Sequence, residues 1–157
     1  MSTTLTEPGA TFAGRLAAAS AGPSSLPRTV LRVALGGALA FAGTMHLTVA
    51  RAEFQAQVPP WVPLDADLVV VLSGVAEIAL GLALIALPRR RAAVGLVAAA
   101  FFVAVFPGNL SQYLDRIDAF GLTSDGARLT RLFFQPLLVA WALWSTDAWR
   151  VLVRRRA

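Results

Sequence analysis

Long apolar runs, each able to cross a lipid bilayer, determine the fold expected of this chain. Residues 68–87 read LVVVLSGVAEIALGLALIAL and contain Glu77 as their single charged residue. A helix that crosses the hydrocarbon core of a membrane needs about 20 mainly apolar residues. Comparable runs occupy three further ranges, 31–50, 92–110 and 132–149. The sequence therefore predicts an all-α fold in which four spans form a transmembrane four-helix bundle.

The composition supports the same class of protein. Of the 157 residues, 57% are hydrophobic and 15% are charged, whereas soluble domains carry about 25% charged residues. A soluble fold of this size would expose too much surface for so few charges to cover. Because the chain has no cysteine and one histidine, disulfides, thiol catalysis and an ordinary zinc site are excluded. No catalytic nucleophile, phosphate-binding loop or metal cluster is recognisable, so we expect no catalytic activity from this chain alone.

The first 27 residues differ from the rest of the chain. Ser, Thr, Ala, Gly and Pro dominate residues 1–27, and such a segment buries too little apolar area to offset the entropy of ordering it. We expect a disordered N-terminal segment that allows a short helix at residues 16–20. Its order of residue types does not fit a signal peptide, so the first span is expected to act as an uncleaved anchor. Residues 28–153 form the predicted membrane domain, and residues 154–157 form a basic tail.

The basic residues, all of them arginines, are distributed unequally between the connections. Most lie in the N-terminal segment, in the connection between the second and third spans, and in the C-terminal tail. The other two connections collect most of the acidic residues. Because cytoplasmic loops are enriched in arginine, both termini are expected in the cytoplasm. The formal charge of +5 is thus interpreted as a topology signal, with the tail contacting anionic lipid, and not as nucleic-acid binding. An alanine- and arginine-rich chain without lysine suggests a bacterial cytoplasmic membrane.

Few polar side chains fall within the predicted spans, and an ionisable group there is a candidate for function. At a rise of about 1.5 Å per residue, His46 and Gln135 lie about 6 Å below the outer surface, and Glu77 lies about 14 Å below it. Asn109 falls in the same outer layer as His46, and Arg131 lies at the rim. We expect His46, Asn109 and Gln135 to form the wall of a binding pocket and Glu77 to form its floor.

A purely structural role for these polar residues is the alternative to a binding pocket. Glu77 and His46 can pair simply to fix the packing of the bundle, and Asn109 can cap backbone groups freed where Pro107 and Gly108 interrupt the third helix. Small residues on the same faces of the first two spans predict positions where a neighbouring helix packs closely. They are Gly36, Ala40 and Gly43 in the first span and Ser73, Gly74 and Gly81 in the second.

The connection at residues 51–67 is too apolar for a loop that lies wholly in water. Its three prolines prevent a regular helix through it, and it carries the aromatic residues Phe54 and Trp61. We expect this connection to form a lid over the outer mouth of the bundle. An ordinary linker at the membrane interface is the alternative.

An ordered series of short motifs resembles the DoxX-like family of small membrane proteins. The motifs are AGTMH (42–46), VPPWVP (58–63), SGVAE (73–77), VFPGN (105–109) and RLFFQ (131–135). The resemblance covers roughly residues 30–147 and implies a four-helix transmembrane bundle. It also implies that the recurrent polar positions are His46, Glu77, Asn109, Arg131 and Gln135. That family includes a subunit of a thiosulfate–quinone oxidoreductase, so the resemblance implies a protein associated with redox enzymes.

These observations favour a non-catalytic membrane subunit or accessory protein of a redox system. It would bind a quinone or another small apolar ligand in the outer half of the bundle, with Phe54 and Trp61 covering the ligand. The expected partners are the lipid bilayer and either a redox enzyme or a second copy of the chain. A structural scaffold that docks a cytoplasmic partner is the main alternative, and a small transporter is the less favoured one.

Overall fold

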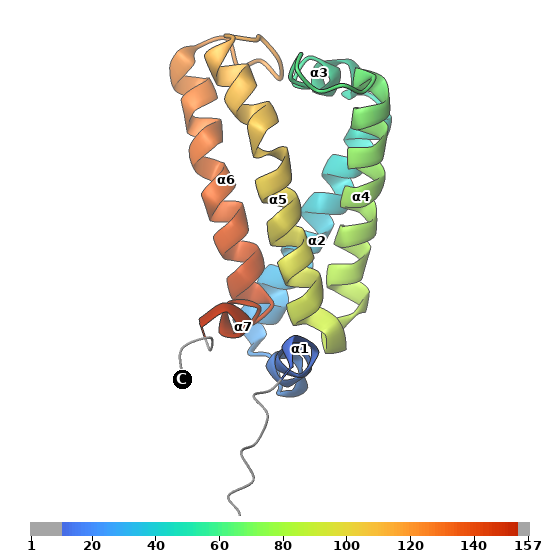
Figure 1. The fold of residues 1–157 in the computed structure, drawn as a ribbon, viewed down its shortest axis with the longest axis vertical. Helices are drawn as coiled ribbons and strands as arrows, with labels where there is room; N and C mark the ends of the chain where they lie inside the picture. The colour runs from blue at the N-terminus through green and yellow to red at the C-terminus, as the bar shows by residue number, and fades with distance from the viewer. Residues whose placement is uncertain (1–10, 154–157) are drawn as a thin grey trace, which may run out of the picture.

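The computed structural model describes residues 11–153, and every regular element in that range is helical, as predicted. Four long helices lie side by side, namely α2 (Leu26–Leu47), α4 (Ala66–Ala86), α5 (Arg91–Leu114) and α6 (Asp125–Ser145). The short elements are α1 (Phe12–Ala21), α3 (Arg51–Gln55), the 3-10 turn η1 (Pro88–Arg90) and α7 (Trp149–Val153). Figure 1 shows α1 and α7 at one end of the bundle, which we name the inner end, and α3 at the other, the outer end.

Three of the long helical segments are long and apolar enough to cross a membrane. Within the described part of the chain they are α2, α4 and the continuous segment Pro88–Leu114, which contains α5. Helix α6 is not among them, because Arg128, Arg131 and Gln135 interrupt the apolar character of its first half. These three candidate membrane-spanning helices indicate a multi-pass membrane protein. The fourth span, predicted at 132–149, is not among them.

Several of the predicted helix ends differ from the observed ones. The third helix, predicted to end at 110 and to be interrupted at Pro107, runs without a break through Pro107 to Leu114, since neighbouring groups in a membrane protein can compensate for the missing N–H of a proline. Helix α6 begins earlier than predicted because the hydroxyl of Ser124 accepts a hydrogen bond from the backbone N–H of Ala127, at 3.2 Å, and caps the helix.

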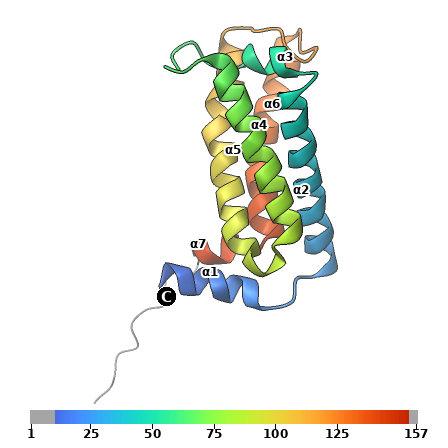
Figure 2. The same ribbon diagram turned by 90° about the vertical axis from the view of Figure 1, so that its right-hand side faces the viewer.

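The short helix expected at residues 16–20 is confirmed within α1, which is longer and spans residues 12–21. The expectation of disorder over residues 1–27 is wrong for the rest of α1 and for residues 26–27, which begin α2. The hydroxyl of Thr11 caps α1 by accepting a hydrogen bond from the N–H of Gly14. Figure 2 shows α1 lying across the inner end of the bundle. The guanidinium of Arg91 holds it there by donating hydrogen bonds to carbonyls at the C-terminal end of α1, those of Ala19, Ser20 and Gly22. The rest of the N-terminal prediction, residues 1–10, and the basic tail at 154–157 lie outside the described residues.

The long helices form two pairs, α2 with α4 and α5 with α6. Glycines hold the first pair in direct backbone contact, which confirms the predicted stripe of small residues. A Cβ atom added at Gly43 would lie 2.5 Å from the carbonyl oxygen of Gly74, and one at Gly81 would lie 2.5 Å from that of Gly36. No side chain larger than hydrogen fits at these contacts.

The two pairs meet through apolar side chains towards the inner end and diverge towards the outer end (Figure 1). Buried residues from all four long helices form this contact, among them Leu39 of α2, Leu84 of α4, Phe102 of α5 and Ala142 of α6. The divergence leaves space between the pairs only in the outer half of the molecule, which is where the candidate site lies.

A buried carboxylate seals the inner end. Asp147 is 1% exposed and follows α6, and it accepts from Arg28 of α2 at 2.6 Å and from Arg91 of α5 at 3.2 Å. Arg150 of α7 lies 3.2 Å from the same carboxylate. We name these four residues the Asp147 cluster. Three of the arginines that were interpreted as a topology signal therefore also hold helices together.

Candidate functional site

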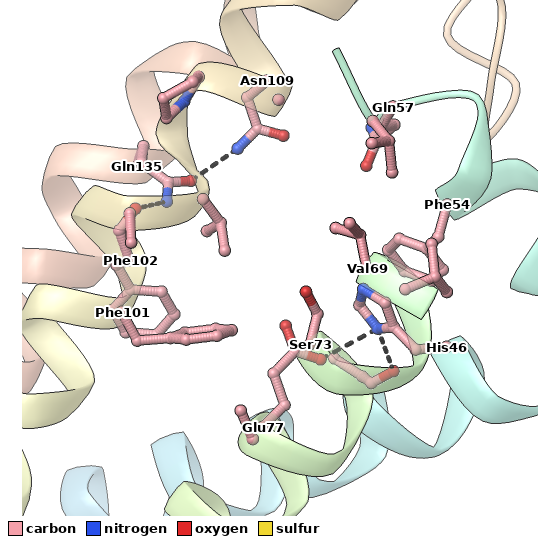
Figure 3. A pocket seen from close by; sticks show the side chains of 18 of the residues that line it. His46, Phe54, Gln57, Val69, Ser73, Glu77, Phe101, Phe102, Asn109 and Gln135 are labelled. Carbon is pink, nitrogen blue, oxygen red and sulfur yellow. Dashed lines mark hydrogen bonds and ion pairs between the residues drawn. The ribbon is translucent and has the colours of Figure 1, made fainter. Parts of the chain in front are cut away.

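A cavity of about 750 Å³ lies between the two helix pairs. Its lining is mainly apolar and comes from all four long helices and from the connection after α3. All seven residues singled out from the sequence line it, namely His46, Phe54, Trp61, Glu77, Asn109, Arg131 and Gln135. Figure 3 shows that its polar groups fall on two opposite sides, with His46 and Glu77 facing Asn109 and Gln135 across the space.

His46 and Glu77 form the first polar side. Nδ1 of His46 lies 2.9 Å from the carbonyl oxygen of Ala42 and 3.0 Å from Oε2 of Glu77. A carbonyl only accepts hydrogen bonds, so Nδ1 carries the hydrogen and donates it to Ala42. As a result, Oε2 of Glu77 has no hydrogen-bond donor among the described residues although it is buried. The glycine contacts between α2 and α4 place the two side chains this close.

Phe54 covers this side of the cavity. Its ring stacks on the imidazole of His46 with the ring centroids 3.4 Å apart and the planes 17° from parallel. Helix α3, which carries Phe54, is fastened to the start of α4 by Arg51, whose Nε donates to Asp67 at 2.6 Å. The hydrogen bond to Asp67 raises the pKa of Arg51, so its guanidinium stays charged. The short helix thus has a fixed position over His46.

A chain of hydrogen bonds forms the second polar side. Nε of Arg131 donates to Oδ1 of Asn109 at 3.1 Å, and Nδ2 of Asn109 donates to Oε1 of Gln135 at 2.8 Å. Nε2 of Gln135 in turn donates to the backbone carbonyl of Phe102. The alternative reading of Asn109 as a cap at a broken helix is therefore wrong, because its side chain joins α5 to α6.

Arg131 brings an unneutralised positive charge to this side. Its nearest acidic neighbours in the sequence, Asp118 and Asp125, both pair with Arg128. Among residues 11–153 no carboxylate forms an ion pair with Arg131, whose Nη2 instead donates to Oε1 of Gln57 at 3.1 Å. The cavity therefore has a carboxylate on one side and a guanidinium on the other.

Gln57 was not predicted as a site residue. This buried side chain donates from Nε2 to Oε1 of Gln112 at 2.5 Å and accepts from Arg131. Its place beside the apolar run 58–64 was the only signal in the sequence. Its partners lie more than 50 residues away in the sequence, so only the fold reveals them.

The outer mouth of the cavity is covered by what we name the roof, comprising α3, the connection 56–65 and the connection 115–124. Oε2 of Glu53 accepts from the N–H of Phe120 at 2.6 Å, and the rings of Phe54 and Phe120 lie edge to face with centroids 4.5 Å apart. These contacts join the two helix pairs across the mouth. Trp61 lines the cavity but is 68% exposed, so Phe54 covers the cavity more fully than Trp61 does.

A family model described as a domain of unknown function, DUF8561, matches residues 35–146. The chain belongs to the DUF8561 family. The DUF8561 region contains all seven candidate residues and Gln57, and it leaves α1 outside. No DoxX family model matched, so that resemblance and its redox association are not supported by the family assignment. Searches of curated proteins and of solved structures returned no match. Within residues 11–153, no three His, Cys, Asp or Glu side chains are grouped so that they could hold a metal ion.

Proposed function

We propose that this protein is a non-catalytic membrane subunit or accessory protein that binds a quinone or a chemically similar small ligand between its two helix pairs. The observation that carries the proposal is the buried Oε2 of Glu77, which lines the cavity and lacks a hydrogen-bond donor. A buried polar atom without a partner costs about 1–3 kcal/mol. A ligand hydroxyl that donates to this oxygen would recover that cost.

The opposite side of the cavity supports the same class of ligand. Arg131 offers hydrogen-bond donors and a positive charge, which suit a carbonyl or hydroxyl oxygen of the ligand. A quinone ring carries two oxygens at opposite ends of a flat apolar body, and its reduced form carries two hydroxyls. The aromatic and aliphatic lining suits the ring, and a volume of about 750 Å³ falls in the range of small-molecule sites.

Binding of a quinol to wild-type and Glu77→Gln protein in lipid nanodiscs tests the proposal. The probe is a benzoquinol with a decyl chain. Glutamine keeps the size of the side chain but replaces an accepting oxygen with a donating NH₂ group, so we expect the affinity to fall about tenfold, which is about 1.4 kcal/mol. Asp125→Asn makes the same carboxylate-to-amide change at an exposed residue outside the cavity lining and should leave the affinity unchanged. If wild-type protein does not bind the quinol, or if Glu77→Gln binds it equally well, the proposal is wrong.

We also propose that α6 crosses the membrane, so that both termini lie in the cytoplasm of a bacterial cell. Helix α6 runs the length of α5, and the contact of Arg28 with Asp147 places the start of α2 and the end of α6 at the same end. Its exposed residues Phe133, Phe134 and Leu137 suit contact with lipid.

The natural absence of cysteine allows a direct test of this topology. Single cysteines at Ser25, Thr123 and Val153, all exposed, are reacted with a membrane-impermeant maleimide in whole cells. We expect labelling of Thr123→Cys in intact cells and of the other two variants only after permeabilisation. Labelling of Val153→Cys in intact cells together with Thr123→Cys would show that α6 does not cross the membrane.

A further inference from the structure

We infer that the ligand enters the cavity sideways from the membrane, between α4 and α5, and that it is an amphiphile whose hydrocarbon chain lies in this opening. The inference rests on the proposed function, since it concerns the same cavity. It adds the route of entry and the requirement for a chain. It follows from the closure of both ends of the cavity and from the exposure of lining residues on α4 and α5.

Both ends of the cavity are closed. The roof crosses the outer mouth through the contacts of Glu53 and Phe54 with Phe120 and through the hydrogen bond of Gln57 to Gln112. Towards the inner end the helix pairs meet in the buried apolar contact that includes Leu39 and Phe102. A ligand that approached from water on either side would have to displace one of these contacts.

The side between α4 and α5 is open. Leu72 of α4 lines the cavity and is nevertheless 55% exposed, so the cavity reaches the molecular surface beside it. On α5, Ala104 also lines the cavity and is exposed. Ala76 of α4 is a further small residue in the lining. Apart from their short connection at the inner end, α4 and α5 contact each other little and diverge in Figure 1.

This opening faces hydrocarbon. The two segments that bound it both qualify as membrane spans, so the conclusion does not depend on α6. Leu72 lies six residues into α4, which is about 9 Å along the helix at 1.5 Å per residue. The opening therefore lies below the level of the headgroups, where an apolar chain is soluble and a free polar solute is not.

The position of the polar groups fixes the orientation of the ligand. Glu77 lies about one and a half turns deeper along α4 than Leu72. Arg131 donates to Asn109, which lies on the opposite side of the cavity (Figure 3). When the polar ring of the ligand lies between Glu77 and Arg131, the hydrocarbon chain attached to the ring extends towards the apolar opening. The ligand class is therefore a membrane-dissolved molecule with a small polar head and a hydrocarbon chain.

The test narrows the opening and compares two probes in nanodiscs. One probe is a benzoquinol with a decyl chain, and the other is the same quinol ring without the chain. Leu72→Trp places a large side chain at the opening. Val75→Trp is the matched control, since Val75 is 53% exposed on the same helix but does not line the cavity. We expect Leu72→Trp to weaken the chain-bearing probe about tenfold through lost contacts of the chain, and Val75→Trp to leave both probes unaffected.

The two probes separate this inference from the proposed function. Unchanged binding of the ring without a chain to Leu72→Trp shows that the variant is folded and that only the opening is affected. If the variant weakens both probes equally, or weakens neither, lateral entry with a bound chain is overturned while ligand binding stands. If neither probe binds wild-type protein, the proposed function itself fails.

Discussion

Replacing Asp147 with asparagine is expected to lower the free energy of unfolding by about 3–5 kcal/mol, the usual effect of removing one member of a buried ion pair. Arg91 is 5% exposed and has no other carboxylate partner in the described chain. In the variant its charge stays buried without compensation, and Arg28 also loses its partner. Thermal unfolding in mild detergent measures the effect.

Arg150→Ala is the control for this prediction. Arg150 contacts the same carboxylate, but its side chain is 46% exposed, and exposed ion pairs contribute about 0–1 kcal/mol. The control should therefore melt close to the wild type. Equal melting temperatures for Asp147→Asn and Arg150→Ala would show that the Asp147 cluster does not hold the inner end together.

The same variant should loosen α1, because Arg91 both pairs with Asp147 and binds the carbonyls at the end of α1. Trypsin cleaves after arginine, and Arg15 lies within α1. Faster cleavage at Arg15 in Asp147→Asn, at a temperature where the bundle remains folded, reports this loosening. An unchanged rate would show that α1 is held independently of Asp147.

The second large effect is expected from Gly43→Ala. The added Cβ would lie 2.5 Å from the backbone oxygen of Gly74 and 3.0 Å from the Cβ of Glu77, so α2 and α4 must separate. Overpacking of this kind costs about 1–3 kcal/mol. His46 and Glu77 lie beside the same glycine contact between α2 and α4. Separation of these two helices should therefore also weaken quinol binding.

Gly37→Ala is the matched control on the same helix, where an added Cβ meets no atom within 4 Å. Alanine favours a helix over glycine by about 0.5–1 kcal/mol, so this variant should be as stable as wild type or slightly more so. Thermal unfolding and quinol binding of both variants check the prediction. A Gly43→Ala protein that matches Gly37→Ala in both measurements would contradict the close helix contact.

Apolar runs and helical phase predicted the helices and the faces on which they meet. Glu77 shares a face with Gly74 and Gly81, and His46 shares one with Gly43, so contact between the glycines also brings the two polar side chains together. Hydropathy predicted the helix ends less accurately than the helix faces. It reports which residues are apolar enough to contact lipid, whereas the end of a helix depends on backbone hydrogen bonds and caps. Thus the cap at Ser124 extends α6 into a polar segment.

Partners that are distant in the sequence were not predictable. Nothing near Asp147 in the sequence indicates that its carboxylate is buried among arginines of three other elements, and nothing near Gln57 indicates Gln112. Such contacts depend on how the helix pairs are placed relative to one another. The spacing of apolar residues along the sequence predicts which face of each helix is buried. The contacts that close the inner and outer ends of the bundle form only when the two helix pairs pack together, so the sequence does not reveal them.

The Asp147 cluster also bears on the synthesis of the protein. Arg28 and Asp147 are 119 residues apart, and the N-terminal part of a chain leaves the ribosome first. Arg28 and Arg91 are therefore made well before the carboxylate that neutralises them both. A chain that stops short of residue 147 keeps these guanidiniums without their shared partner, and its inner end stays unsealed.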